Sequence, residues 1–329
     1  MRPEPVLEVR GLTTRIRTRS GSFAAVDGVS FEIAPAEALA LVGESGSGKS
    51  MTCLSLVRLL PPAVEEASGS VRLDGEELTE KSPAEMRRIR GRDLAMILQD
   101  PLESLNPVIP IGRQVAESVR LDSPRPPRAA VRERVVGLLR RVRIPGAEHR
   151  LRSYPFQFSG GMRQRVTAAI AIARQPKVLI ADEPTTALDV TTQRQFLDLL
   201  DELRREDGLA LLLVTHDLGL VAETCDRVAI MYAGRIVEHG TVQRVFSEPA
   251  HPYTRALLDS LPELGGERLR RLPQIAGEPP DMHALPPGCR FAPRCPFAHD
   301  RCGSEYPPET QLEDGAVACW LAVEGVEAA

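Results

Sequence analysis

Residues 43–50, Gly43-Glu44-Ser45-Gly46-Ser47-Gly48-Lys49-Ser50, match the pattern G-x-x-x-x-G-K-[ST]. The stretch follows an apolar run, Leu39–Val42, that predicts a strand, and it precedes a helical pattern over 50–60. Glycines let consecutive backbone N–H groups turn toward phosphate oxygens, and the start of the helix adds positive potential. We expect Lys49 to reach the outer phosphates of a nucleotide and the Ser50 hydroxyl to hold Mg²⁺. The alternative, a glycine-rich turn that binds nothing, is disfavoured by the strand–loop–helix context.

Two carboxylates end a second predicted strand. The apolar run Val178–Ala181 leads directly into Asp182 and Glu183. Burying such a pair is costly unless a cation lies nearby, so the pattern favours a metal or phosphate site. We expect Asp182 to bind Mg²⁺, directly or through water, and Glu183 to polarise the water that attacks the γ-phosphate. For this pair taken alone, a solvated turn at the end of the strand is the alternative.

Two more predicted strands end in polar side chains that suit the same site. His216 follows the apolar strand Leu209–Thr215, and Gln99 follows Leu94–Leu98. Strands that alternate with helices indicate an α/β sheet, whose ligands lie at the carboxyl ends of the strands. His216 is therefore predicted to reach the γ-phosphate, although a histidine at a strand end is more often structural. Together these features indicate a nucleoside triphosphatase.

The composition narrows the class of protein. The chain has 329 residues, of which 43% are hydrophobic and 26% charged, which is typical of a globular chain long enough for two domains. Its 45 acidic and 41 basic residues give a formal charge of −4, which argues against a protein that coats nucleic acid. Neither a signal peptide nor an apolar run of roughly 18 residues is evident, so we expect a soluble, cytosolic protein.

A second glycine-bearing helix start lies at Phe158-Ser159-Gly160-Gly161-Met162-Arg163-Gln164-Arg165. Ser159 is predicted to cap this helix, whose first turn offers another site for an anion. One nucleotide does not need two such helices from one chain, whereas a dimer that holds nucleotide between its subunits does. Ahead of this motif, residues 100–158 alternate turn formers with amphipathic stretches such as Val131–Val142, which predicts an inserted helical subdomain.

In this arrangement the chain resembles the ATP-binding subunits of ABC transporters over residues 1–245. The motifs that carry the resemblance are the phosphate loop at 43–50, the Q-loop at Gln99, the signature at 159–164, the Walker B strand at 178–183, the D-loop Ala187-Leu188-Asp189 and the H-loop at His216. The resemblance implies an α/β fold: a P-loop NTPase ATP-binding domain over 1–245, with a helical subdomain inserted at about 100–165.

The resemblance also assigns roles to residues. Catalysis would involve Lys49, Gln99, Glu183 and His216, and Mg²⁺ would be held by Ser50, Gln99 and Asp182. The residues expected to bind ATP are Phe23, Gly43, Glu44, Ser45, Gly46, Ser47, Gly48, Lys49, Ser50 and Thr52, together with Ser159, Gly160, Gly161 and Gln164 on the signature side. In this family Ser159, Gly160 and Gly161 would contact the γ-phosphate bound by the partner subunit. Phe23 stands near the family's adenine-stacking aromatic, and simple packing is an equal alternative for it.

Two positions depart from the family pattern. The signature usually starts with leucine and here starts with Phe158. The apolar character is kept, so we expect a packing adjustment and retained activity. The residue before Glu37 is usually glycine and here is Ala36, which we do not expect to touch nucleotide.

The tail, residues 246–329, narrows the resemblance to oligopeptide and dipeptide importer ATPases and related nickel importers. Its markers are His251-Pro252-Tyr253-Thr254, Gly288-Cys289-Arg290-Phe291 and Arg294-Cys295-Pro296, and the stretch Asp100–Pro107 after the Q-loop agrees with them. The resemblance implies an ATPase that powers peptide import from the cytoplasmic face of the bacterial inner membrane. Its implied partners are a second ABC ATPase subunit, preferably a paralogue, two transmembrane permeases and, through them, an extracytoplasmic peptide-binding protein, with no nucleic acid.

Two alternatives to peptide import stay open. The first is an importer of nickel or another small solute. The second is a soluble ABC-type ATPase that acts on DNA or ribosomes, which is disfavoured because no coiled-coil insertion or basic surface is evident.

Four of the six cysteines fall in the last 41 residues, at Cys289, Cys295, Cys302 and Cys319. Their spacing, C-x5-C-x6-C-x16-C, fits no ordinary zinc template. Relatives in this family carry a [4Fe-4S] cluster, so the resemblance implies one here, which would make the tail a redox or sensing module. Zinc and unligated buried cysteines remain as alternatives. Cys53 and Cys225 fall in helical patterns and are expected to be small core residues.

Overall fold

The computed structural model describes residues 3–99, 104–121, 126–186, 188–260 and 275–325. The chain folds into two compact units, each assembled from separate stretches of sequence. Unit 1 consists of Met1–Leu7, Ile33–Ala38 and Leu73–Val214, and unit 2 of Glu8–Glu32, Leu39–Arg72 and Thr215–Ala329. The phosphate loop and the cysteine-rich tail therefore belong to the same unit.

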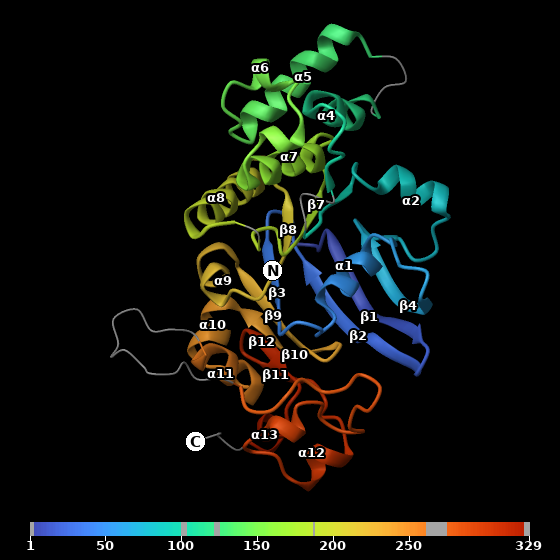
Figure 1. Ribbon diagram of the computed structural model, residues 1–329. Coiled ribbons are helices and arrows are strands. Elements are labelled where there is room, and N and C mark those ends of the chain that lie inside the picture. Colours follow the sequence, from blue (N-terminus) through green and yellow to red (C-terminus); the bar gives the residue numbers. More distant parts are fainter. Residues whose placement is uncertain (1–2, 100–103, 122–125, 187, 261–274, 326–329) are drawn as a thin grey trace. The chain divides into compact units, whose positions relative to one another are not determined.

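Unit 2 contains a run of paired strands to which the tail contributes. Their order is β11 (Thr310–Leu312), β12 (Gly315–Val317), β10 (Arg235–Thr241), β9 (Arg227–Tyr232) and β3 (Ala38–Val42) (Figure 1). β3 and β9 are parallel, with Val42 opposite Ile230, whereas β10 is antiparallel to both β9 and β12. Two short strands from the last 20 residues of the described chain, β11 and β12, thus extend the sheet that contains β3, the strand before the phosphate loop.

A second set of strands in unit 2 is longer than the sequence predicts. β1 (Leu7–Thr18), β2 (Gly21–Ile33) and β4 (Val64–Leu73) lie side by side in the order β2-β1-β4. Apolar runs in the sequence predict strands only over Val6–Val9 and Val29–Ile33, which cover the apolar ends of β1 and β2. The remainder alternates buried and exposed positions, with polar residues such as Thr14 on the buried face. A strand prediction based on apolar runs alone therefore gives strands that are too short.

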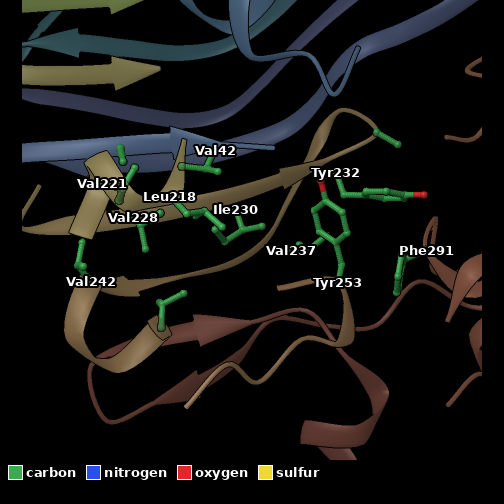
Figure 2. Packing of buried hydrophobic residues seen from close by; sticks show 13 residues of the cluster. Val42, Leu218, Val221, Val228, Ile230, Tyr232, Val237, Val242, Tyr253 and Phe291 are labelled. Carbon is green, nitrogen blue, oxygen red and sulfur yellow. The ribbon is translucent and has the colours of Figure 1, made fainter. Parts of the chain in front are cut away.

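Aromatic residues join the tail to the core of unit 2. β9 packs against α9 (Leu218–Thr224) and α10 (Val242–Ser247), and the same cluster includes Tyr253 of α11 (Pro252–Asp259) and Phe291 (Figure 2). Tyr232, Tyr253 and Phe291 are each at most 2% exposed, and their ring centroids lie 4.6–5.4 Å apart. Burying such a ring contributes about 1.5–3 kcal/mol. The tail is consequently fixed to β9, the neighbour of β3 in the sheet.

Unit 1 contains three parallel strands and the helices that follow them. β6 (Leu94–Ile97), β7 (Val178–Asp182) and β8 (Ala210–Thr215) pair in register, with Leu94 opposite Val178 and Val178 opposite Ala210. Their side chains are almost all buried, which explains the uninterrupted apolar runs in the sequence. All three predicted strands are confirmed to within one residue.

Helices dominate unit 1 between β6 and β7. α4 (Ile111–Arg120), α5 (Arg128–Arg141) and α6 (Ala147–Arg150) gather beside α7 (Gly160–Ile172), and α8 (Val190–Asp207) follows β7 (Figure 1). α2 (Pro83–Ile89) precedes β6, and the two-residue strand β5 (Glu76–Glu77) precedes α2. α7 begins directly after Ser159, as the predicted cap requires. α8 begins after Asp189, whose side chain accepts a hydrogen bond from Thr192 N.

The sequence missed several short elements. These are α9, α10, β10 to β12, α12 (Asp300–Ser304), α13 (Trp320–Glu324) and the 3-10 helices η1 (Pro155–Gln157) and η2 (Ala292–Arg294). Each is too short to show a clear period. Cys225 follows α9 as its C-cap residue and is half-buried, so its predicted helical position is wrong, whereas Cys53 is fully buried inside α1 (Lys49–Leu56). Among the described residues, no helix combines the length and apolar character needed to cross a membrane.

Candidate functional site

The phosphate loop has a backbone that only glycine can adopt at several positions. It connects β3 to α1, and Gly46 and Gly48 have φ angles of 78° and 104°. A Cβ on Gly43 would lie 2.1 Å from the carbonyl oxygen of Met231, and one on Gly48 would lie 2.2 Å from that of Ala25. Side chains are therefore excluded where the loop approaches its neighbours.

The loop encloses its own lysine. Lys49 is 5% exposed, and its Nζ donates hydrogen bonds to the carbonyl oxygens of Gly43, at 2.8 Å, and Glu44, at 2.9 Å. The Ser47 hydroxyl is buried and, in the part of the chain that the structure describes, has no hydrogen-bond partner. A buried hydroxyl without a partner is unfavourable, so the loop fits an anion that accepts this hydrogen bond. Ser50 is half-buried in the first turn of α1.

Thr52, also expected to bind ATP, is fully buried. Its hydroxyl donates to the carbonyl oxygen of Gly48 over 3.0 Å. The side chain of Thr52 therefore supports the loop from inside α1.

The end of β7 brings two predicted residues together in unit 1. Gln99 Nε2 donates a hydrogen bond to Glu183 Oε2 over 3.0 Å, and the Thr186 hydroxyl donates to the same oxygen over 3.1 Å. Glu183 has a φ of 43°, a left-handed conformation that is unfavourable for a residue with a side chain. Its N–H is bonded to the carbonyl oxygen of Val214, on β8. Two donors and a constrained backbone thus fix the direction of this carboxylate.

Asp182 and His216 stand where the sequence predicts, at strand ends. Asp182 is the last residue of β7 and is 4% exposed, whereas His216 directly follows β8 and is exposed. Asp217, the next residue, caps α9 by accepting hydrogen bonds from the N–H groups of Gly219 and Leu220. This cap fixes the turn that carries His216.

The signature motif begins α7. Ser159 Oγ accepts a hydrogen bond from Met162 N over 3.3 Å, and Gly160 and Gly161 form the first turn. A Cβ on Gly161 would lie 2.2 Å from the Thr192 methyl carbon, so α8 demands glycine there. Gln164 is 1% exposed, and neither polar atom of its amide has a hydrogen-bond partner among the described residues. Gln164 therefore faces the interior of unit 1.

The two departures from the family pattern have structural counterparts. Phe158 is 4% exposed, with the Arg150 guanidinium 5.5 Å from its ring centre, in keeping with the expected packing adjustment. Ala36 has a φ of 58°, which explains why glycine is usual at this position. Asp189 caps α8 through Thr192, and these hydrogen bonds hold the pKa of its carboxyl below the usual value. Ala187 and residues 100–103 lie outside the described chain.

Phe23, the predicted adenine-stacking residue, contacts the tail. Its ring lies edge-on to the His283 ring, with centroids 4.8 Å apart and planes at 71°. His283 Nε2 is also within hydrogen-bonding distance of the hydroxyls of Thr18 and Ser20. The tail thus reaches the strand that carries Phe23.

Contacts from the tail to the phosphate loop are the functional feature that the sequence did not reveal. Tyr253 Oη accepts a hydrogen bond from Glu44 N over 2.9 Å. The Arg294 guanidinium donates to both carboxylate oxygens of Glu44, over 2.7 and 3.0 Å, and this pairing raises the pKa of Arg294. Burial raises the pKa of the Tyr253 phenol, which therefore stays protonated. Both residues lie in motifs that mark the tail, but no local pattern links them to residue 44.

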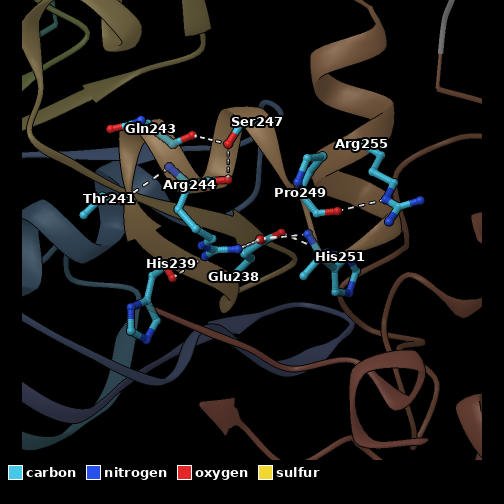
Figure 3. A network of polar contacts seen from close by, with 10 residues as sticks. Glu238, His239, Thr241, Gln243, Arg244, Ser247, Pro249, His251 and Arg255 are labelled. Carbon is cyan, nitrogen blue, oxygen red and sulfur yellow. Dashed lines mark hydrogen bonds and ion pairs between the residues drawn. The ribbon is translucent and has the colours of Figure 1, made fainter. Parts of the chain in front are cut away.

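A buried carboxylate holds α11, which carries Tyr253. Glu238, on β10, is completely buried and accepts hydrogen bonds from Ala250 N and His251 N, both over 2.9 Å (Figure 3). Arg244 completes the pairing of Glu238. The His251 Nδ1 atom then accepts from Tyr253 N over 3.0 Å, capping the helix. The position of Tyr253 is therefore set by an ion pair as well as by packing.

The four tail cysteines line one cavity. Cys289, Cys295, Cys302 and Cys319 share it with His251, Trp320 and neighbouring apolar residues. The cavity measures about 10 Å³, which is room for one water molecule, so a larger ligand would have to displace these side chains. Burial raises the pKa of Cys289 and of Cys319 to about 11, so both carry their proton at neutral pH. No group of three or more metal-binding side chains in the described ranges is close enough to hold a single ion.

The residues that line the cavity nevertheless include four soft sulfur donors. Thiolates from four cysteines are the usual ligands of iron–sulfur clusters. His251 lines the same cavity, and burial lowers its pKa to about 3, so it is neutral. Because its Nδ1 accepts a hydrogen bond, the proton lies on Nε2, which is buried without a partner in the described structure. This N–H group fits a hydrogen-bond acceptor in the cavity.

Comparison with known proteins identifies the family. Residues 26–186 match the ABC transporter family, and residues 237–302 match the C-terminal region of oligopeptide/dipeptide transporters. A Brucella abortus protein named "Putative peptide import ATP-binding protein" is 52% identical over 307 residues, which cover 93% of this chain and 92% of that protein. The chain belongs to the ATP-binding subunits of ABC transporters. Within them it groups with the oligopeptide/dipeptide importers.

Further relatives agree. The dipeptide transport ATP-binding protein DppD of Bacillus subtilis is 46% identical over 97% of this chain and 95% of its own length. Among solved structures, the ATP-binding cassette MJ0796 in a dimeric post-hydrolysis state with ADP and Pi is similar with a TM-score of 0.64 and 25% identity. That match covers 72% of this ABC ATPase chain and 98% of the cassette. The P-loop ABC ATPase fold is thereby shown.

Proposed function

We propose that this ABC ATPase hydrolyses ATP to power the import of di- or oligopeptides. The observation that carries the proposal is the phosphate loop with its enclosed Lys49 and unpartnered Ser47 hydroxyl, on a chain similar over its length to peptide import ATP-binding proteins. The loop provides a site for the phosphates, and membership of the ABC transporter family indicates ATP hydrolysis as the reaction. The tail match supports peptides as the solute, while nickel and other small solutes stay possible outcomes of a transport assay.

Residues of the chain divide the chemistry among them. The phosphates are bound by the backbone N–H groups of 43–50 and by Lys49. On binding them, Lys49 Nζ leaves the carbonyl oxygens of Gly43 and Glu44 that it now contacts. Ser50 and Asp182 would supply the hydroxyl and carboxylate oxygens that Mg²⁺ prefers, and Gln99 would add an amide. Mg²⁺ held there would supply positive charge to balance the charge that develops on the phosphates. Glu183 accepts a proton from the attacking water, and Gln99 and Thr186 aim its carboxylate.

A second ATPase subunit completes the site. Ser159, Gly160 and Gly161 form a capped helix start, which suits an anion bound to another subunit. The Ser159 hydroxyl accepts from Met162 N and still has its own proton to donate to a γ-phosphate oxygen. His216 would contact the γ-phosphate held by its own subunit. We favour a paralogous partner, as the family resemblance implies.

Membrane permeases dock on the helical part of unit 1, in our proposal. Tyr154 and Phe156, just ahead of the signature, stack at 5.6 Å between ring centroids and are 36% and 70% exposed. Val108, after the Q-loop, is 78% exposed. Exposed aromatic pairs are typical of interaction surfaces. Residues of about 100–165 thus form the permease-facing helical subdomain, and the chain works as a peripheral subunit at the cytoplasmic face of the membrane.

The tail, about 246–329, forms a Cys/Pro-rich extension that binds a [4Fe-4S] cluster in our proposal. The support is the shared cavity of the four cysteines and the unpartnered His251 Nε2–H beside it. Anaerobic purification followed by iron and sulfide analysis and absorbance spectroscopy tests this. About four iron and four sulfide per chain are expected, falling to near zero in Cys289→Ser and unchanged in Cys225→Ser. Zinc in place of iron, or no metal, would contradict the cluster.

ATP hydrolysis in the assembled transporter tests the main function. Lys49→Ala and Glu183→Gln are each expected to abolish ATP-driven uptake of a peptide into vesicles. Lys81→Ala is a matched control, because Lys81 pairs with Glu76 and belongs to none of the nucleotide-binding motifs. Near-normal transport by either site variant would contradict the proposed mechanism. Uptake of nickel and not of peptides would retain the ATPase and change the solute.

A further inference from the structure

Glu44 places a negative charge inside a loop that binds anions. It is the second residue of the phosphate loop, and a carboxylate near bound phosphates weakens their binding because like charges repel. Its side chain is 25% exposed, so solvent screens the charge only in part. A phosphate loop with this residue needs a compensating cation, and Lys49 is committed to the phosphates.

Arg294 of the tail supplies that cation. Its guanidinium forms two hydrogen bonds with the Glu44 carboxylate and is 5% exposed. Its remaining N–H groups donate to Tyr232 Oη over 3.2 Å and, from Nε, to the carbonyl oxygen of Ala276 over 2.9 Å. Because these partners belong to β9 and to the tail, Arg294 is held in place independently of Glu44. A bidentate pair of this kind is strongly directional.

Tyr253 holds the backbone of the same residue. Its hydroxyl accepts from Glu44 N, and its ring is buried between Tyr232 and Phe291. The start of its helix is anchored by Glu238. Both the backbone and the side chain of Glu44 are therefore fixed by residues outside the nucleotide-binding motifs.

A second arginine supports the far end of the loop indirectly. Arg290, next to Cys289, contacts the carbonyl oxygen of Ala233 and the carboxylate of Asp27. The neighbouring Gly234 N donates to the carbonyl oxygen of Ser47 over 2.8 Å. The tail segment between two cysteines thus supports the phosphate loop directly at Glu44 and, through residues 233–234, indirectly at Ser47.

We propose that Arg294 and Tyr253 are positioning residues of the nucleotide site. Arg294 cancels the charge of Glu44, Tyr253 fixes its backbone, and the tail thereby sets the affinity of the phosphate loop for nucleotide. The inference rests on the proposed function. It adds that the cysteine-bearing tail acts on the ATPase of its own subunit.

Titration of the full-length protein with MgADP measures the effect. Arg294→Gln is expected to weaken binding by about 5- to 20-fold, the range of a typical coupling between sites. In the double variant Glu44→Gln/Arg294→Gln, the repulsive charge is gone, so affinity returns to within about threefold of wild type. Arg294→Lys retains the positive charge but not the two parallel hydrogen bonds, so its affinity should lie between those of wild type and Arg294→Gln. The KM for ATP rises in parallel, by more than kcat falls.

The control variant is Arg301→Gln, which removes another arginine–glutamate pair of the tail. It is expected to leave the affinity for MgADP unchanged. A merely structural role predicts a double variant as weak as Arg294→Gln, and this result, or binding by Arg294→Gln within twofold of wild type, overturns the proposal. If circular dichroism shows that Arg294→Gln does not fold, Tyr253→Phe decides: weaker binding by about threefold or more supports it, and unchanged binding overturns it. Wild-type protein that binds no MgADP contradicts the proposed function instead.

Discussion

The amide of Gln99 donates a hydrogen bond to the carboxylate of Glu183 over 3.0 Å. Gln99 follows β6, and Glu183 follows the neighbouring parallel strand β7, so the sheet register brings them together. Because Gln99 immediately precedes the segment proposed to face the permeases, movement of that segment would change the hydrogen bonding of the base. The pair therefore offers a direct route from permease docking to hydrolysis.

Removing the base should separate binding from hydrolysis. Glu183→Gln keeps the size of the side chain and its contacts but cannot take a proton, so kcat is expected to fall by about 100- to 10,000-fold. The Kd for MgATP should stay near that of wild type. Phosphate release and nucleotide titration measure the two quantities. A kcat within threefold of wild type would remove Glu183 from the proposed role.

Gln99→Ala tests the positioning of the base. Thr186 still donates to Glu183, so a smaller loss of kcat, about tenfold, is expected. If the bond also carries the signal from the permeases, stimulation of the ATPase by the assembled transporter should disappear. The ratio of activities with and without permeases measures this, and a ratio equal to that of wild type would contradict the coupling.

Ser159 allows helix capping to be separated from contact with phosphate. Aspartate caps helices as well as serine does, and its charge is favourable at a helix start, so Ser159→Asp should retain the melting temperature. Its carboxylate would repel a γ-phosphate, and ATP-dependent dimers should be lost. Ser159→Ala should instead cost about 1 kcal/mol of stability through the lost cap. Light scattering of the variant mixed with its partner ATPase subunit, in the Glu183→Gln background, detects the dimer, and dimers formed by Ser159→Asp would rule out the contact.

Phe156 tests the proposed permease surface. It is 70% exposed on η1, so Phe156→Asp should fold normally and hydrolyse ATP at the basal rate of the free subunit. Copurification with the permeases should fall by about tenfold or more, because a central aromatic dominates binding in such surfaces. Leu59→Asp, another exposed apolar position, serves as the control. Undiminished copurification of Phe156→Asp would place the docking surface elsewhere.

Motifs with a local physical reason could be predicted from the sequence, and long-range contacts could not. The phosphate loop, the cap at Ser159 and the apolar strands β6 to β8 each follow from neighbouring residues. The pairing of Glu44 with Arg294 joins residues 250 positions apart. Neither residue is unusual in its own segment, so no pattern signals the contact. The short strands β11 and β12 could not be predicted for a related reason: β12 pairs with the distant β10, and β11 pairs with β12.

Ala36 carries a cost that the family's usual glycine avoids. Its φ of 58° lies in the left-handed region, while its N–H is bonded to Gly208 and its carbonyl oxygen to Arg204. Glycine relieves a conformational penalty of about 1–2 kcal/mol and adds some entropy to the unfolded chain. Ala36→Gly is therefore expected to raise the free energy of unfolding by about 0.5–1 kcal/mol, with ATPase activity unchanged. Ala34→Gly, at a residue without a positive φ, should lower it by about 0.5 kcal/mol. Urea titration of both variants measures the difference, and an Ala36→Gly protein no more stable than wild type would show that the turn bears no such strain.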